Sequence, residues 1–189
     1  MTLKVAWHVV RLNDVAPTPW RNGGGTTREL LAWPDSVAWR WRASVAEVVQ
    51  DGPFSSFAGV TRWFAVLEGD GVCLTLDGRA KTLVKGDAPF AFDGAVSASC
   101  ELLGGVTQDF NLMVQADVSA NLRRVNENFA MMTNAPKIIA AYTHKEGANV
   151  QIGSEFHALS PYSFGWMHVE ANTPVHIQAS DALLVEIEI

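Results

Sequence analysis

Short segments in which apolar and polar residues alternate, each followed by a turn signal, dominate this sequence. They constrain its fold more than any other feature. In the run over residues 37–49, Trp41 and Ala43 fall on one face of an extended strand, whereas Arg42 and Ser44 fall on the other. A helix would repeat its apolar positions every three to four residues, and that period is hard to find in this chain. The sequence therefore predicts a fold built from strands.

The clearest predicted hairpin follows this run. Residues 61–68 are rich in β-branched and aromatic types, and the turn signal Gly69-Asp70-Gly71 separates them from a return strand over residues 72–76. Further extended segments are predicted at 81–84, 88–92 and 106–115, and again after residue 137. Many short strands joined by turns are typical of a sandwich or barrel, so we predict an all-β fold.

Length and charge exclude several classes of protein. The chain has 189 residues, of which 48% are hydrophobic, so it can bury a sizeable core. Its formal net charge is -6 and its lysines and arginines form no cluster, which argues against a nucleic-acid partner. No stretch approaches the ~18 apolar residues that a membrane span needs, and the first residues lack the apolar core of a signal peptide. We expect a cytoplasmic protein without nucleic-acid or membrane partners.

A change of composition divides the chain into two parts. Residues 1–116 carry most of the strand signals, whereas residues 117–132 are more polar, which we interpret as a connector of irregular or extended structure. Residues 86–88 (Gly-Asp-Ala) and 180–182 (Ser-Asp-Ala) form a loose echo, because both precede an apolar run. The simplest interpretation is a duplicated unit, with a first barrel over residues 1–116 and, over residues 117–189, the connector and a degenerate second barrel.

A run of three glycines after Asn22 is the most unusual local sequence in the chain. Gly23, Gly24 and Gly25 can adopt positive φ and let a ligand approach the backbone, and their N–H groups could form an anion-binding nest. No Gly-Lys-Ser/Thr follows, as a Walker A loop requires, and no helix is expected next, as a dinucleotide fingerprint requires. A bulged turn without a ligand is the alternative interpretation.

Two arginines are candidate carboxylate binders. Arg42 shares its strand face with Ser44 and Ala46, and small residues beside an arginine are typical of a barrel interior. The same pattern would suit a strand whose tryptophan face forms the core and whose arginine faces solvent. Arg62 opens the next predicted strand and could supply a second bidentate contact, or could lie on the surface.

Four further polar residues could complete such a site. Thr27 and Glu29 share one face of the segment after the glycines, and Asp109 and Asn111 share one face of a later strand. Either carboxylate could accept a hydrogen bond, neutralise the arginines, or act as a general acid or base if burial shifts its pKa. A buried salt-bridge network is the alternative for both carboxylates.

The histidines give no metal-binding signal. None forms a His-x-His or His-Glu-x-x-His motif, so a metal site would need residues distant in sequence. Ser-His-Asp catalysis is not indicated, because no Gly-x-Ser-x-Gly motif occurs. We therefore expect no metal and no other cofactor. The histidines are His8, His144, His157, His168 and His176.

Six motifs taken together resemble the HutD/Ves family, whose genes usually accompany those for histidine utilisation in bacteria. They occur in order as WRNGGGTTREL (Trp20–Leu30), WRASVAEV (Trp41–Val48), DGPFSSFAGVTR (Asp51–Arg62), LEGDG (Leu67–Gly71), PFAFDG (Pro89–Gly94) and DFNLM (Asp109–Met113). The last third of the chain carries few diagnostic residues. The combination is far more specific than any one of its segments.

The resemblance implies a bicupin, with two cupin-type β-barrels in one chain. The paired histidines of metal cupins are missing, because Arg62 and Glu68 stand in the region of the first cupin motif. In the second motif, the stretch over residues 86–93 has aromatic and acidic residues where a histidine would be needed. Without these ligands we do not expect a tight transition-metal site or the oxygenase or isomerase chemistry that it supports.

The resemblance also implies that the protein tunes histidine catabolism by binding a small carboxylate intermediate. Urocanate is the first choice, and formylglutamate or formiminoglutamate the second. An arginine would hold the carboxylate, the glycine loop a polar end, and Phe92 would form an apolar wall. The expected ligand-binding residues are Asn22, Gly23, Gly24, Gly25, Thr27, Glu29, Arg42, Ser44, Arg62, Phe92, Asp109 and Asn111.

Two other functions compete with this one. An enzyme acting on a formyl or formimino compound would use Glu29 or Asp109 for acid–base catalysis. A protein–protein interaction module would instead have an interior filled by its own side chains. Exposed edge strands would also allow a homodimer.

Overall fold

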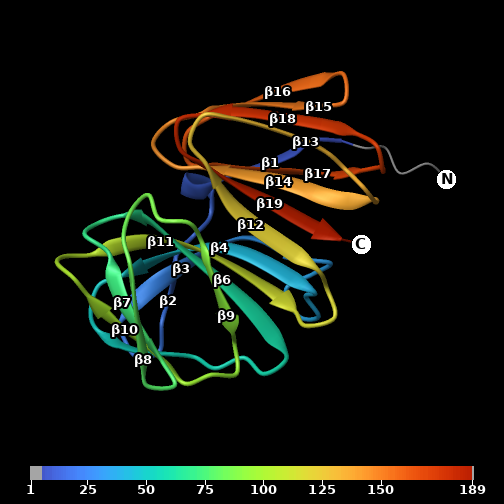
Figure 1. Cartoon of the computed structure of the whole chain (residues 1–189). Helices are drawn as coiled ribbons and strands as arrows, with labels where there is room; N and C mark the ends of the chain where they lie inside the picture. The colour runs from blue at the N-terminus through green and yellow to red at the C-terminus, as the bar shows by residue number, and fades with distance from the viewer. Residues whose placement is uncertain (1–5, 189) are drawn as a thin grey trace. The chain divides into compact units, whose positions relative to one another are not determined.

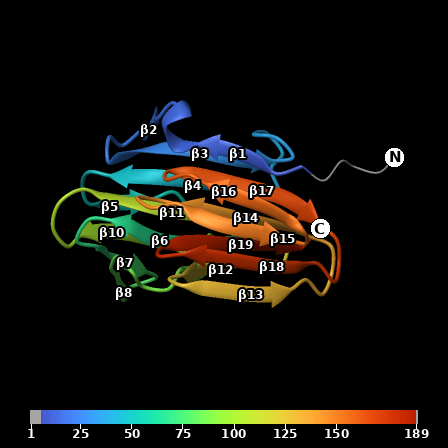
Figure 2. The same ribbon diagram turned by 90° about the horizontal axis from the view of Figure 1, so that it is seen from above.

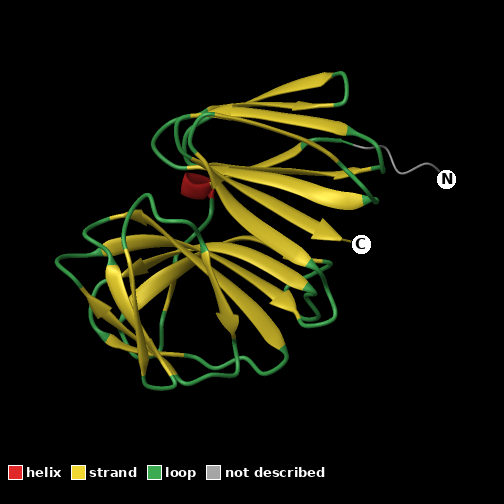
Figure 3. Cartoon of the chain, in the orientation of Figure 1, coloured by secondary structure: helices red, strands yellow, loops and turns green. Residues whose placement is uncertain are grey.

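The computed structural model describes residues 6–188, which form two compact units. The first unit comprises Val15–Asp117, and the second comprises the described parts of Met1–Asp14 and Val118–Ile189. Strands make up nearly all the regular structure of these residues. The helical structure within them is one short 3-10 turn, η1 (Leu12–Asp14), which is red in Figure 3. The prediction of an all-β fold is confirmed. None of the residues in this part of the chain forms a helix long and apolar enough to cross a membrane.

The first unit contains two antiparallel sheets (Figure 1). The larger sheet consists, in spatial order, of β2 (Thr18–Pro19), β3 (Gly25–Trp33), β4 (Trp41–Val48), β11 (Thr107–Gln115), β6 (Val60–Glu68) and β9 (Phe90–Asp93). The smaller sheet consists of β5 (Gly52–Phe54), β10 (Ala98–Leu102), β7 (Val72–Leu76) and β8 (Arg79–Leu83). The strands form two separate sheets and do not close into one barrel.

A hydrophobic cluster joins the two sheets of the first unit. Phe64 and Val66 on β6 contribute from the larger sheet, and Leu74 and Cys100 contribute from the smaller sheet. Successive residues of a strand point to opposite faces, so these contacts identify the face of each strand that lies inside. Arg62, two residues before Phe64, therefore lies on the interior face of β6.

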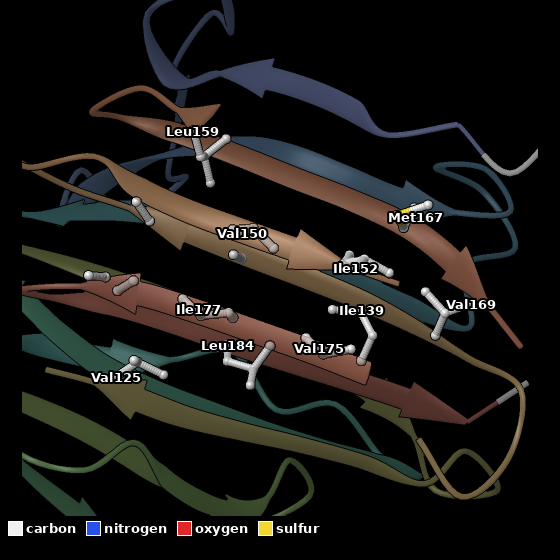
Figure 4. Packing of buried hydrophobic residues seen from close by; sticks show 14 residues of the cluster. Val125, Ile139, Val150, Ile152, Leu159, Met167, Val169, Val175, Ile177 and Leu184 are labelled. Carbon is white, nitrogen blue, oxygen red and sulfur yellow. The ribbon is translucent and has the colours of Figure 1, made fainter. Parts of the chain in front are cut away.

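The second unit also contains two antiparallel sheets, which overlap in the view of Figure 2. The larger sheet consists, in spatial order, of β1 (His8–Arg11), β17 (Ser163–Val169), β14 (Lys137–Thr143), β19 (Ala182–Glu188) and β12 (Ala120–Val125). The smaller sheet consists of β13 (Asn128–Met132), β18 (Pro174–Ala179), β15 (Ala148–Ile152) and β16 (Glu155–Leu159). Ile139 and Leu184 from the larger sheet pack with Val150 and Ile177 from the smaller sheet (Figure 4).

Both units have the same order of strands. In the first unit the sheets contain β4-β11-β6-β9 and β5-β10-β7-β8, and in the second β12-β19-β14-β17 and β13-β18-β15-β16. Each strand in the second set therefore comes eight strands after its counterpart in the first set. Strands from nearer the N-terminus extend each larger sheet, β3 and β2 beyond β4, and β1 beyond β17. The chain thus contains two copies of one eight-stranded arrangement.

One detail differs from the sequence predictions, and a second makes them more specific. The turn at Gly69-Asp70-Gly71 forms, with positive φ at both glycines, but β6 and β7 lie in different sheets and do not pair as a hairpin. Alternating polarity identifies a strand without identifying its partner, and this turn carries the chain from one sheet to the other. The polar stretch interpreted as a connector forms β12 and β13, which are integral strands of the second unit.

The first strand of the chain belongs to the second unit. Residues of β1 pair with β17, with His8 opposite Trp166 and Arg11 opposite Ser163. The backbone N–H of Leu12 also donates to the carbonyl of Tyr162 at 2.8 Å. The sequence analysis grouped this segment with residues up to 116, because pairing between strands so distant in sequence leaves no local signal.

Candidate anion-binding site

Polar side chains from four strands, with Phe92 from a fifth, share the interior face of the larger sheet in the first unit, whose strands are labelled in Figure 1. They form three rows across the strands. The rows are Thr27-Ala46-Asp109-Val66, then Glu29-Ser44-Asn111-Phe64, then Ala32-Arg42-Met113-Arg62-Phe92. Side chains within a row are ~5 Å apart at Cβ, and successive rows are ~7 Å apart. This face therefore gathers the predicted residues of β3, β4, β6, β9 and β11.

Arg62 is the most deeply buried cation of this site, with 7% of the residue exposed. Its Nη1 donates to the carbonyl oxygen of Ser55 at 3.2 Å, and its Nη2 donates to Oδ1 of Asn111 at 3.4 Å. Across residues 6–188, no carboxylate oxygen lies within 4.0 Å of its guanidinium. Burial and, secondarily, the charge of Arg42 lower the pKa of Arg62 to about 10, so it is still charged at neutral pH.

Arg42 lies nearer the surface in the same row. Its Nη1 is 3.6 Å from Oε2 of Glu29, and its Nη2 donates to the sulfur of Met113 at 3.1 Å. A thioether is a weak acceptor, and the Glu29 side chain is 39% exposed, so neither partner compensates the charge of Arg42 fully. The sequence left the orientation of Arg42 open, and the structure places it on the interior face.

Aromatic rings surround both guanidinium groups. The Phe57 ring centre lies 5.9 Å from Cζ of Arg42 and 5.8 Å from Cζ of Arg62, so the two arginines share it. Phe54 and Phe92 lie 5.3 and 5.2 Å from Cζ of Arg62. Rings in these positions stabilise a cation without neutralising its charge. Phe92 is therefore an apolar wall, as expected, but the site has further walls.

Sequence reasoning missed four contributors to this site. Phe54 lies on β5, and Ser55 and Phe57 lie in the loop after it, where no strand period indicates which way a side chain points. Trp39, whose ring centre is 5.4 Å from Cζ of Arg42, precedes the start of β4. The sequence feature that could have indicated these residues is the motif over residues 51–62, which places two phenylalanines shortly before Arg62.

Three interior side chains each have a buried polar atom without a hydrogen-bond partner among the described residues. These atoms are Nε of Arg42, Nε of Arg62 and Oδ1 of Asp109. An unsatisfied buried polar group costs ~1–3 kcal/mol, so native proteins usually provide each with a partner. A bound ligand or ordered water would supply the missing partners here.

Asp109 occupies a separate, deeper position. It is 0% exposed, and its Oδ2 accepts a hydrogen bond from Oγ1 of Thr107 at 2.7 Å. Burial raises the pKa of Asp109 to about 7, although the Thr107 hydrogen bond acts in the opposite direction. Of the two candidate carboxylates, Glu29 approaches an arginine, whereas Asp109 does not form an ion pair within the described chain.

The glycine run lies away from the arginines. Gly25 is opposite Val48 on β4, six residues from Arg42, which corresponds to ~20 Å along the strand. The N–H of Gly23 donates to the carbonyl of Trp20 at 3.1 Å, and the N–H of Gly24 donates to Oδ1 of Asn22 at 3.0 Å. Because the turn itself uses these donors, it offers no nest to an anion, and one small ligand cannot reach both the turn and Arg42.

The remaining predicted residues lie between these two ends. Ser44 is buried and stands between Glu29 and Asn111 in the middle row. Oγ1 of Thr27 accepts a hydrogen bond from the indole of Trp20 at 2.7 Å, so it faces the end with the glycines. We therefore centre the site on the row that contains Arg42 and Arg62, with Glu29, Ser44 and Asn111 beside it.

The charge of this site favours an anion. Two arginines lie close together, and the nearest carboxylate is partly exposed and 3.6 Å from one of them. Guanidinium groups bind carboxylates through paired hydrogen bonds, and the surrounding apolar rings strengthen such contacts by excluding water. Over the described chain, no group of three or more His, Cys, Asp or Glu side chains gathers as a metal site would require.

Comparison with known proteins identifies the family. The family model HutD matches residues 12–185. The chain belongs to the HutD family. A curated relative, described as an uncharacterized 21.2 kDa protein in the hutC 3'region of Pseudomonas putida, is 43% identical over 108 residues. Those residues are 56% of this HutD-family chain and 56% of the relative, so the match spans little more than half of each protein.

Solved structures support the same assignment. The structure of HutD from Pseudomonas fluorescens SBW25, described under a formate condition, has a TM-score of 0.82 and 30% sequence identity, covering 96% of this chain and 98% of that one. A cupin 2 conserved barrel domain protein from Leptotrichia buccalis has a TM-score of 0.58 at 10% identity, covering 99% of each chain. The second likeness concerns the fold alone, which is cupin-like in this HutD-family protein.

Proposed function

We propose that the first unit binds a small carboxylate between Arg42 and Arg62, and that this binding tunes histidine utilisation. The observation that carries the proposal is Arg62, a buried cation with no carboxylate within 4.0 Å in residues 6–188 and with an unpartnered Nε. A buried charge is costly unless it is paired, so a ligand carboxylate would supply what the fold omits.

Urocanate is the first candidate ligand, and formylglutamate or formiminoglutamate the second. The rings of Phe54, Phe57 and Phe92 around Arg62 would suit the flat side of a planar, conjugated acid. Glu29, at the partly exposed edge, could accept a hydrogen bond from an imidazole N–H at the other end of urocanate. The more flexible glutamate derivatives would lack this flat contact.

The family supports the biological context of this proposal. A HutD-family relative from Pseudomonas putida is named for its place in the hutC region, and HutD from Pseudomonas fluorescens is described under a formate condition. Formate is the smallest carboxylate and therefore belongs in any ligand panel. The shared eight-strand order of the two units supports the finer proposal that they are the cupin-type halves of a bicupin.

Calorimetry tests the proposal directly. The protein is titrated with urocanate, formylglutamate, formiminoglutamate, formate and histidine, alongside the variants Arg62→Ala and Arg40→Ala. Truncating one partner of a buried charged contact costs about 2–5 kcal/mol, so Arg62→Ala should weaken binding at least about tenfold. Arg40 is a matched control, since its side chain is 54% exposed and pairs with Asp117 at 2.9 Å. Equal affinity in the two variants, or no binding at millimolar ligand by the wild type, would refute the proposal.

An enzyme that acts on a formyl or formimino compound is the second candidate. Asp109 supports it, because a buried carboxyl whose pKa is about 7 can exchange a proton at neutral pH. Product analysis of the same samples distinguishes the two functions. Turnover by the wild type that is lost in Asp109→Asn, with binding retained, would favour the enzyme, and binding without turnover would favour the sensor.

A further inference from the structure

The second unit also places a cation on the interior face of its larger sheet, but with a carboxylate beside it. In the first unit, Arg62 lies two residues before Phe64 on β6, and Asn111 on β11 is directly opposite Phe64. The counterparts of β6 and β11 by strand order are β14 and β19. The positions that correspond to this pair can therefore be identified from the pairing of β14 with β19.

Lys137 and Glu186 occupy those positions in the second unit. Lys137 lies two residues before Ile139 on β14, and Glu186 on β19 is directly opposite Ile139. Ile139 belongs to the hydrophobic cluster between the two sheets (Figure 4). Lys137 and Glu186 share the face of Ile139 by strand alternation and register, so they also lie on the interior face. A cation on one strand thus recurs in both units, whereas the neutral Asn111 is replaced by a carboxylate.

The carboxylate of Glu186 is held as a bound anion would be. Its Oε1 lies 3.0 Å from Nη2 of Arg123, and its Oε2 lies 3.2 Å from Nζ of Lys137, so each oxygen has its own cation. The side chains of Lys137 and Glu186 are 7% and 11% exposed. Arg123 comes from β12, the counterpart of β4, but it is opposite Leu184 and its side chain is 39% exposed, so it does not occupy the position of Arg42.

An aromatic ring also lies over a cation in the second unit, although at a different position from the rings of the first unit. The ring centre of Phe129 on β13 lies 4.7 Å from Cζ of Arg123. Strand β13 is the counterpart of β5, whose Phe54 lies over Arg62 in the first unit. Each unit therefore has a buried cation on its interior face and an aromatic ring over a cation, and in the second unit Glu186 lies between Lys137 and Arg123.

We propose that the second unit contains a carboxylate-binding site occupied by the chain's own Glu186, which a free small monocarboxylate would fill if that side chain were removed. Glu186 closes the site in the native protein, so each chain would take up one external anion, in the first unit. Replacing Glu186 by alanine removes a CH2–COO⁻ group, and acetate has the size and charge of what is removed. The site lies in the other unit and its test does not depend on what the first unit binds.

Acetate rescue in a background without Arg62 tests this inference. The variants Arg62→Ala/Glu186→Ala, Arg62→Ala/Glu186→Gln and Arg62→Ala are melted in rising acetate and in chloride of equal ionic strength. The alanine variant should gain at least about 3 °C in Tm from acetate beyond the gain of the other two. The glutamine variant loses the same charge but leaves no space, so acetate should not rescue it. Arg62→Ala/Glu188→Gln controls for loss of an exposed carboxylate on the same strand.

Acetate binding and folding of the Glu186→Ala variant decide whether the inference holds. Saturable acetate binding by the Glu186→Ala variant, at about one per chain, supports the inference, and so does folding of that variant in acetate but not in chloride. An acetate response equal to that of the glutamine variant overturns it. Failure of the alanine variant to fold in either salt, while the glutamine variant folds, also overturns it, because a site built for a carboxylate would accept the free one.

Discussion

Replacement of Asp109 by asparagine should remove a specific dependence of stability on pH. Asp109 is fully buried, and its carboxyl titrates near pH 7 in the folded protein because burial disfavours the charged form. In the unfolded chain the same group titrates near its ordinary value of 3.8. Asparagine has the same shape, cannot ionise, and can still accept the hydrogen bond from Thr107.

The expected size follows from these two pKa values. Below about pH 4 both states hold the proton, so Asp109 has no pH-dependent effect. Between about pH 4 and pH 7 the folded protein keeps a proton that the unfolded chain releases, so stability falls by up to about 1.4 kcal/mol per pH unit. The rise in pKa from 3.8 to about 7 corresponds to a total loss of about 4 kcal/mol in the free energy of unfolding. This loss stays constant at higher pH.

Urea unfolding between pH 5 and pH 8 measures this effect. The difference in unfolding free energy between Asp109→Asn and the wild type should rise in favour of the variant as pH rises, and should level off above pH 7. Fluorescence and circular dichroism should both be recorded, since two units can unfold in separate steps. Glu101→Gln removes an exposed carboxylate of the same unit, so its unfolding free energy should depend on pH as that of the wild type does. If the unfolding free energy of Asp109→Asn has this same pH dependence, the assignment of a neutral buried carboxyl is wrong.

Two further substitutions test the site and its support. Asn111→Asp would place a carboxylate where the Asn111 oxygen is now 3.4 Å from Nη2 of Arg62, so it should weaken binding of any carboxylate at least about tenfold in calorimetry while the protein stays folded. Affinity equal to the wild type would contradict this. Gly25→Ala would drive a methyl group into the carbonyl oxygen of Glu47 and should cost about 2 kcal/mol in urea unfolding. Gly105→Ala, which meets no atom within 4 Å, is the control, and equal stability of the two variants would contradict the packing argument.

Alternating polarity predicted the strands well but not which of their faces lies inside. On β4, Trp41 and Ala43 are 1% and 0% exposed, and Ser44 on the other face is 3% exposed. Both faces are therefore buried, and the usual rule that the apolar face is the interior of the sheet does not apply. The sequence could not decide between the two orientations of Arg42, because that choice depends on what covers each face.

Local patterns placed the strand residues of the candidate site, but not its loop residues or the hydrogen bonds within the glycine turn. Arg62, Glu29 and Asn111 lie on strands, so counting residues showed which neighbours share a face with each of them, but not which face lies inside. Phe57 lies in a loop, where contacts with distant strands set the direction of a side chain. In the turn before Gly25, hydrogen bonds within the loop decide whether an N–H is free, and composition does not record them.

The position of β1 has a consequence for synthesis on the ribosome. Its partner β17 emerges only after the whole of the first unit, whose residues are continuous in the chain from Val15 to Asp117. The first unit can therefore fold as it leaves the ribosome, while β1 waits for a neighbour. During that interval β1 is an unpaired strand, and until it docks, β17 is an open edge that another chain could occupy. Completion of the second unit thus depends on β1 joining β17.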